Sequence, residues 1–360
     1  MTGTDALNED VVVAAQFDGG ALDCGGGLLL LLTRNLRRVE PGEVLAVHTL
    51  EPSVPPDLED WASLAGHTIV DSVADAEGWT VRVRRSGGSK ADPFSSGPAT
   101  PLGSRLWMYT NFNCNLACTY CCAASSPSAQ ARLLPVEVAA AAADEFVALG
   151  GQEIVLTGGE PFMHPEIGAL VAEVSRRAPV VILTNAMVFS KGARRAALES
   201  MDRGEVTLQI SLDSAEPDLH DAHRGAGSHA RAMSGIALAR SLGFHVRVAA
   251  TIDERETAST AALHARLDEI GIPSQDRLIR PIAAQGVAEF GVPVTIDEVA
   301  PEPTLTADGL WWHPVAITDQ RLKVSDSPLP LVEAFGTIRD TVAVQDAARH
   351  AGRRHVFRCA

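Results

Sequence analysis

The sequence has no excess of basic residues. Its 360 residues include 30 lysines and arginines against 45 aspartates and glutamates, which gives a formal charge of −15. The arginines are scattered, whereas a nucleic-acid partner requires a basic face that displaces counterions from phosphate. The composition therefore argues against nucleic-acid binding.

The sequence also lacks the segments that carry a protein into a membrane. The start, MTGTDALNEDVVV, has neither the basic region nor the apolar stretch of a signal peptide. The longest run of large apolar side chains is five leucines, Leu28 to Leu32, and a bilayer needs about 20 residues. We expect a cytoplasmic protein without a membrane partner.

Cysteines are few, and four of the six lie within nine residues, in NFNCNLACTYCCAASS from Asn111 to Ser126. Such clustering does not resemble a disulfide framework, and in a reducing compartment it more often indicates metal binding. Nearly half of the chain is apolar, which is enough for two domains or for one large α/β barrel with an appendage.

Composition divides the chain. The stretch SGGSKADPFSSGPATPLGS is almost entirely Ser, Gly, Pro and Ala, so it cannot build a core and is typical of a flexible linker. We predict four parts: a small domain at 9–86, a linker at 87–104, a barrel at 105–284 and a C-terminal extension at 285–360.

The two larger parts have different predicted topologies. Before the linker, the order of strand-like and helix-like segments is βαβαββ, which predicts a two-layer α+β domain. After it, six strand-like segments alternate with helices whose apolar residues recur at three and four. Six successive βα units predict an α/β fold with a parallel sheet, a partial (β/α)6 TIM-type barrel.

The cysteine loop follows the first predicted barrel strand, and barrels keep their chemistry at the carboxyl ends of the strands. Three thiolates at C-x-x-x-C-x-x-C spacing can hold three irons of a [4Fe–4S] cluster and leave the fourth iron open. Tetrahedral zinc is an alternative, although it usually requires a second C-x-x-C pair. A loop with incidentally buried cysteines is the third interpretation.

These residues resemble the radical SAM superfamily. The matches are C-x-x-x-C-x-aromatic-C, at Cys114, Cys118, Tyr120 and Cys121, and a second signature, TGGEP, after the second strand. The resemblance implies that the three cysteines bind a [4Fe–4S] cluster whose open iron binds S-adenosylmethionine. It also implies reductive cleavage to a 5′-deoxyadenosyl radical and an electron donor such as flavodoxin or ferredoxin.

Further cofactor contacts are predicted along the barrel. Paired glycines allow the backbone to approach a ligand, and a carboxylate beside them can accept hydrogen bonds from an ammonium group, so Gly158, Gly159 and Glu160 form the predicted methionine-binding set. By the resemblance, Tyr120 contributes to the adenine side and Ser211, in SLDS, to the ribose. The alternative for Ser211 is a hydroxyl that caps the local backbone.

The remaining cysteines and tryptophans fall outside the hallmark. We expect Cys122 to be a buried thiol that points away from the cluster. The extension has one cysteine, Cys359, and therefore no cluster of its own. Its segment LTADGLWWHPVAITDQRLKVSD predicts a β-hairpin over the barrel mouth, in which Trp311, Trp312 and His313 either touch substrate or belong to the hairpin core.

The first domain resembles TusA-type sulfur carriers, small βαβαββ proteins with a persulfide-bearing cysteine at the start of the first helix. Cys24 precedes the first predicted helix, where the helix dipole favours thiolate. Three glycines, Gly25 to Gly27, replace the family's Cys-Pro-x-Pro. Cys24 is thus a candidate catalytic residue that receives sulfur from a donor protein.

The predicted function is a radical SAM enzyme, an oxidoreductase or transferase, that modifies a small-molecule or peptide substrate. In one hypothesis Cys24 handles sulfur for the reaction. In another the first domain only recognises a substrate or partner. A third, from a different class, is a non-enzymatic iron–sulfur or zinc protein.

Overall fold

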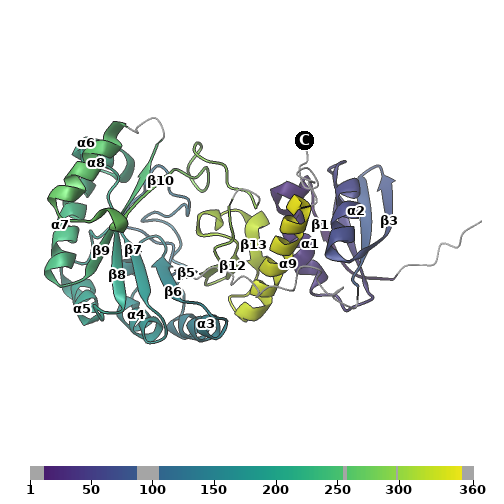
Figure 1. Cartoon of the computed structure of the whole chain (residues 1–360), viewed down its shortest axis with the longest axis horizontal. Helices are drawn as coiled ribbons and strands as arrows, with labels where there is room; N and C mark the ends of the chain where they lie inside the picture. The colour runs from purple at the N-terminus through teal and green to yellow at the C-terminus, as the bar shows by residue number, and fades with distance from the viewer. Residues whose placement is uncertain (1–11, 87–104, 254–257, 297–298, 351–360) are drawn as a thin grey trace, which may run out of the picture. The chain divides into compact units, whose positions relative to one another are not determined.

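The computed structural model describes residues 12–86, 105–253, 258–296 and 299–350 (Figure 1). The chain divides into two compact units. Unit 1 contains the described residues within Met1–Thr100, Thr295–Asp297 and Gly336–Ala360, and unit 2 those within Pro101–Val294 and Glu298–Phe335. No helix in these ranges is long and apolar enough to cross a membrane.

Unit 1 is built on a four-stranded sheet in the order β1-β2-β4-β3, in which only the β1–β2 pair is parallel. The observed order of strands and main helices is the βαβαββ that the sequence predicts. Its elements are β1 (Val13–Asp18), the short π-helical turn η1 (Cys24–Leu28), α1 (Leu29–Leu36), β2 (Val44–Thr49), α2 (Val54–Ala65), β3 (Thr68–Asp75) and β4 (Gly78–Arg84).

Local sequence explains the ends of α2. Prolines at the first helical positions have no amide hydrogen to leave unpaired, and Pro55 and Pro56 lie in the first turn of this helix. Gly66 ends it with a left-handed backbone at φ 75°, a conformation that glycine adopts without strain. The buried residues Leu58 and Trp61 face the core of the unit.

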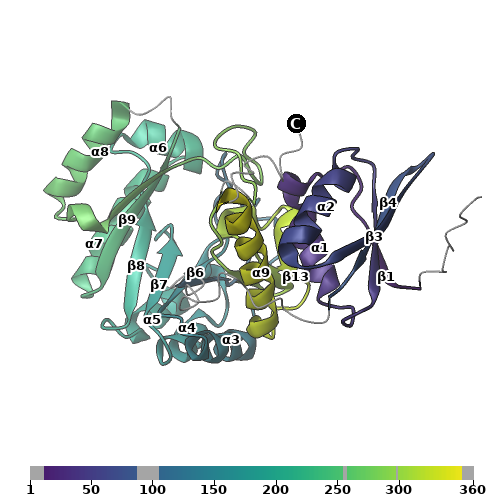
Figure 2. The same cartoon turned by 45° about the vertical axis from the view of Figure 1, so that its right-hand side comes forward.

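Unit 2 contains six parallel strands in sequential order, and this confirms the predicted fold class (Figures 1 and 2). The strands are β5 (Arg105–Tyr109), β6 (Glu153–Thr157), β7 (Val180–Thr184), β8 (Val206–Ser211), β9 (His245–Ile252) and β10 (Arg277–Pro281). The helices between them are α3 (Val136–Ala148), α4 (Ile167–Ser175), α5 (Gly192–Ser200), α6 (Pro217–Arg224), α7 (Ser228–Ser241) and α8 (Ala258–Glu269).

The strands carry short apolar runs because parallel strands are covered on both faces. In β6, for example, Ile154, Val155 and Leu156 are each at most 2% exposed. Helices α3 to α8 lie outside the sheet in both views (Figures 1 and 2). The carboxyl ends of the six strands are therefore left for the connecting loops.

A predicted hairpin extends this sheet beyond β5. Strand β11 (Thr304–Thr306) pairs in parallel with β5 and antiparallel with β12 (Gly309–Trp311), and β13 (Lys323–Ser325) follows at the edge. Trp311 and Trp312 are 1% and 0% exposed, so they belong to the hairpin core. The structure therefore does not support the alternative that these two tryptophans touch substrate.

The last helix, α9 (Leu331–His350), begins in unit 2 and ends in unit 1. At its start, the backbone amide of Leu331 donates to the Glu145 carboxylate at 2.6 Å. At its middle, Asp340 forms an ion pair with Arg37, with 2.5 Å between Nη1 and Oδ2. The linker and Cys359 lie outside the described residues, and the domain boundaries stay predictions.

Candidate functional site

The cysteine loop connects β5 to α3. Backbone hydrogen bonds close it on itself, from Phe112 to Ala131 at 2.7 Å, from Cys114 to Ser126 at 3.2 Å and from Leu134 to Thr110 at 2.9 Å. These bonds hold the loop at the carboxyl end of the first barrel strand, where the sequence predicts it.

A cavity of about 190 Å³ opens beside this loop. Its lining comes from the loop and from the ends of all six parallel strands. The structure brings together seven of the predicted site residues in this lining: Cys114, Cys118, Tyr120, Cys121, Gly158, Gly159 and Ser211. Glu160 is not among the residues that line it, and Cys24 lies in the other unit.

The three hallmark thiols have surroundings that suit sulfur ligands. The backbone amides of Leu116 and Ser125 donate to Cys114 Sγ at 3.4 Å and Cys121 Sγ at 3.3 Å. Burial is the main reason that the pKa of Cys114 is raised to about 12, and the nearby charge of Glu160 is the second reason. Burial also raises the pKa of Cys118. Without a metal these two thiols keep their protons, and metal coordination would have to displace the protons.

The side chains in the cavity indicate whether a single metal ion or an iron–sulfur cluster fits this site. Among the described residues, no group of three His, Cys, Asp or Glu side chains could hold a single metal ion. Thiolates on different irons of one cluster need not converge on one point, and an all-sulfur donor set is the usual ligand set of [4Fe–4S] clusters. The hydroxyl of Ser125, in the lining and 5% exposed, has no hydrogen-bond partner and is available to a bound group.

The paired glycines lie directly on the cysteine loop. A Cβ on Gly158 would come within 2.4 Å of the Asn111 carbonyl oxygen, and one on Gly159 within 2.3 Å of the Asn113 carbonyl oxygen. The Gly159 amide donates to Asn111 at 3.0 Å. The two glycines are thus needed because the cysteine loop packs directly against them. The sequence suggested instead that a ligand approaches their backbone. Their methionine-binding role stays a prediction.

Glu160 is fully buried, and its carboxylate is occupied by the protein. It accepts hydrogen bonds from the Phe162 amide at 3.1 Å, the Thr184 hydroxyl at 2.7 Å and the Asn185 amide at 2.8 Å. Burial raises its pKa, although these three donors oppose the rise. In the structure the side chain positions the end of β7, and its predicted contact with an ammonium group stays untested.

A buried network that sequence reasoning missed supports Tyr120. The Tyr120 hydroxyl donates to the Asp213 carboxylate, and Arg224 donates to the same carboxylate through Nε at 2.5 Å and Nη2 at 3.0 Å. The backbone amide of Thr251 adds a fourth hydrogen bond at 3.0 Å.

The charge of Arg224 decides the ionisation of this network. Burial by itself would raise the pKa of Asp213, but the Arg224 charge and the hydrogen bonds outweigh it and leave that pKa lowered. Asp213 lies in SLDS and Arg224 in HRGAG, two segments that the sequence singled out. Nothing in the sequence showed that they pair across eleven residues.

Two further side chains belong to the lining. Ser211, at the end of β8, makes no hydrogen bond through its hydroxyl to any described residue. Cys122 lines the same cavity, and the expectation that its thiol points away from the cluster stays a prediction. The Cys121–Cys122 backbone is held by the extension, through the Val287 amide to Cys121 at 3.1 Å and the Thr318 hydroxyl to Cys122 at 3.3 Å.

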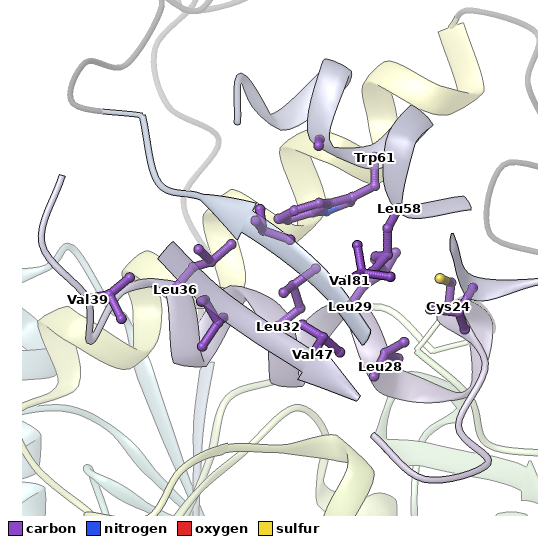
Figure 3. Close-up of a cluster of buried hydrophobic side chains, with 14 residues drawn as sticks. Cys24, Leu28, Leu29, Leu32, Leu36, Val39, Val47, Leu58, Trp61 and Val81 are labelled. Carbon is purple, nitrogen blue, oxygen red and sulfur yellow. The ribbon is translucent and has the colours of Figure 1, made fainter. Parts of the chain in front are cut away.

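Cys24 is 0% exposed and belongs to the apolar core of unit 1, a cluster that also contains Leu28, Leu58 and Trp61 (Figure 3). It lies in η1, where Gly27 takes φ 110° before α1 begins. The thiol is therefore buried as packing, whereas reactive thiols are usually partly exposed.

The fold and the cavity define a partial (β/α) barrel with a cysteine loop and a glycine loop at the carboxyl ends of its strands. A family model described as the Radical SAM superfamily matches residues 108–260. This part of the chain is a radical SAM domain. The superfamily uses a [4Fe–4S] cluster and S-adenosylmethionine.

Relatives with curated names match part of the chain. GTP 3′,8-cyclase 3 of Mycobacterium bovis is 31% identical over 144 residues, which is 36% of each chain. The antilisterial bacteriocin subtilosin biosynthesis protein AlbA of Bacillus subtilis is 33% identical over 146 residues, 39% of this chain and 32% of that protein. The chain thus spans about a third of these two relatives.

A solved structure supports the fold. Native anSMEcpe with bound AdoMet has a TM-score of 0.53 and 10% sequence identity, and the match covers 67% of this chain and 83% of that chain. At this identity the likeness concerns the fold alone.

Proposed function

We propose that the chain is a radical SAM enzyme that cleaves S-adenosylmethionine reductively and modifies a small-molecule or peptide substrate. The observation that carries this proposal is the convergence of Cys114, Cys118 and Cys121 with the paired glycines and Ser211 on one cavity. Neither the cysteine loop nor the glycine motif by itself would require the two to line the same cavity.

The residues have distinct proposed roles. The three cysteines hold the cluster, which when bound supplies the electron that cleaves the cofactor to methionine and a 5′-deoxyadenosyl radical. Gly158 and Gly159 offer backbone groups to the methionine end, and Ser211 offers its hydroxyl to the ribose. Tyr120, held by Asp213, orients toward the adenine side.

Substrate and partners are proposed more broadly. One relative is named a GTP cyclase and another a bacteriocin biosynthesis protein, so both a small molecule and a peptide are admissible substrates. An electron donor such as flavodoxin or ferredoxin would supply the reducing equivalent. A cytoplasmic location remains part of the proposal.

The burial of Cys24 favours recognition over sulfur transfer as the role of unit 1. A persulfide carrier has to expose its sulfur to donor and acceptor, and Cys24 is enclosed by apolar side chains. We therefore assign unit 1 to binding a substrate or partner. Sulfur handling through Cys24 requires an opening of this core.

Anaerobic reconstitution with iron and sulfide tests the proposal. We expect one [4Fe–4S] cluster per chain and slow cleavage of S-adenosylmethionine after reduction. Alanine at any hallmark cysteine should abolish the cluster, whereas Cys122→Ala and Cys359→Ala should retain it. Tight zinc binding in place of iron, or a cluster without cofactor cleavage, would support the non-enzymatic alternative.

A further inference from the structure

Arg280, at the carboxyl end of β10, lines the same cavity as the hallmark cysteines. It lies opposite Thr251 of β9, and its Nε donates to the Thr251 hydroxyl in a long hydrogen bond of 3.5 Å. A guanidinium has five N–H donors, and a partly buried one normally has acceptors for most of them.

No carboxylate of the described residues pairs with Arg280. The lining contains no Asp or Glu. Asp213, which accepts a hydrogen bond from the Thr251 amide, is already bonded to Arg224. The chain as a whole is strongly acidic, so an unpaired arginine in the cavity is not a consequence of excess basic residues.

Arg280 also lies toward one side of the cavity. Burial raises the pKa of Tyr109 on β5, and the charge of Arg280 opposes that rise, so the guanidinium is within electrostatic reach of the first barrel strand. The Tyr109 hydroxyl donates to the Pro314 carbonyl at 2.7 Å, and Pro314 and Val315 of the extension line the cavity there. The predicted cofactor residues Gly158, Gly159 and Ser211 come instead from the ends of β6 and β8.

We propose that Arg280 anchors the substrate by binding an anionic group, a carboxylate or a phosphate, on the side of the cavity formed by β5, β10 and the extension. Both groups offer two oxygens in the planar geometry that a guanidinium binds through paired hydrogen bonds. This inference rests on the proposed function and adds to it the chemical class of the substrate.

Calorimetric titration of the reconstituted full chain, with S-adenosylmethionine bound, tests the inference. Succinate and pyrophosphate serve as the carboxylate and phosphate probes. We expect the wild-type chain to bind at least one of them, Arg280→Gln to bind it at least tenfold more weakly, and Arg280→Lys to fall between. The control is Arg195→Gln, which removes the same charge from a partly buried arginine of α5 that pairs with Glu199 outside the cavity. This variant should bind the probes as the wild type does.

Equal binding by Arg280→Gln, or no binding by the wild type, would overturn the inference. So would weaker binding of S-adenosylmethionine or an altered electron paramagnetic resonance signal of the cluster in Arg280→Gln, because Arg280 would then serve the cofactor. A wild-type chain that assembles no cluster would refute the proposed function instead. Probe binding by that cluster-free chain would still decide whether Arg280 holds the anion.

Discussion

The carboxylate of Glu160 accepts a hydrogen bond from the hydroxyl of Thr184 at 2.7 Å, and this bond joins the loop after β6 to the end of β7. Its other oxygen accepts from the backbone amide of Asn185. Asn185 lines the cavity, and its side-chain amide donates to Asn115 in the cysteine loop at 2.9 Å. Glu160 therefore shapes the cavity through Asn185, without lining it.

Replacement of Glu160 by alanine should reduce the stability of the chain as well as its affinity for S-adenosylmethionine. The change leaves the three buried donors without acceptors, and each unpaired group costs about 1–3 kcal/mol. We expect urea unfolding to show a loss of about 3 kcal/mol or more for Glu160→Ala and less for Glu160→Gln, which keeps one acceptor. If Glu160→Ala binds S-adenosylmethionine more weakly but unfolds with the same free energy as the wild type, then Glu160 acts solely on the ammonium group of the cofactor.

The contact between the glycine loop and the cysteine loop predicts that Gly159→Ala loses the cluster. The added Cβ would meet the Asn113 carbonyl at 2.3 Å, and backbone on both sides leaves no flexible side chain to move. Iron content after reconstitution, by absorbance and metal analysis, should fall several-fold. Gly168→Ala in α4 adds the same methyl group at an ordinary 3.4 Å from Ala197 and should load normally. Full loading of Gly159→Ala would show that the two loops separate freely.

The sequence predicted the order of the strands and the place of the cysteine loop because both depend on local patterns. Each barrel strand is a short apolar run between turns, and consecutive βα units dictate a parallel order. The hallmark spacing fixes which thiols share a loop. Seven predicted site residues meet in one cavity for the same reason, since each lies at the end of a strand or in the loop that follows it.

The contacts that the sequence did not predict depend on packing between distant segments. Cys122 lines the cavity, and residues of the extension hold the backbone before and at that residue. Cys24 is buried because the turn η1 directs its side chain into the leucine-rich core. The local periodicity of the sequence does not predict either of these placements.

The Asp213–Arg224 pair should show strong coupling in a double-mutant cycle. Their side chains are only 4% and 11% exposed, and removal of one partner leaves a buried charge unpaired, which typically costs 3–5 kcal/mol. We expect Asp213→Asn and Arg224→Gln each to destabilise the chain by about that amount, and the double variant by clearly less than their sum. Additive losses in chemical unfolding would show that the pair contributes little as a pair.

His220 should make stability depend on pH below neutrality. Burial, mainly, lowers the pKa of this histidine to about 4 from 6.5, and its Nδ1 accepts a hydrogen bond from the Asp213 amide at 3.1 Å. The unfolded chain therefore binds the proton more tightly, so the contribution is complete above pH 6.5 and is lost as the pH falls toward 4. His220→Asn keeps an acceptor and does not titrate.

Unfolding free energies of the wild type and His220→Asn at pH 7 and pH 5 measure this contribution. One pH unit corresponds to about 1.4 kcal/mol, so the wild type should lose about 1–2 kcal/mol more than the variant between these two values. His313, whose pKa burial also lowers to about 4, is present in both proteins and cancels in the comparison. Equal losses would place the acid sensitivity on other groups.

The enclosure of Cys24 predicts that its thiol is protected in the native chain. Iodoacetamide at neutral pH should modify the Cys24 peptide at least tenfold more slowly in the folded chain than in urea, because the reagent cannot reach a thiol that is 0% exposed. Mass spectrometry of the separated peptide distinguishes Cys24 from the cysteines of the barrel loop. Incubation with a cysteine desulfurase and cysteine should add no sulfur to this peptide.

Opposite results would restore sulfur handling as the role of unit 1. Rapid alkylation would show that the core around Cys24 opens, and a mass gain of one sulfur atom would show that the opening serves a donor protein. The product assay then separates the two hypotheses. Cys24→Ala should form product at the wild-type rate if unit 1 only recognises a substrate or partner, whereas loss of product with normal cleavage of S-adenosylmethionine would require Cys24 in the reaction itself.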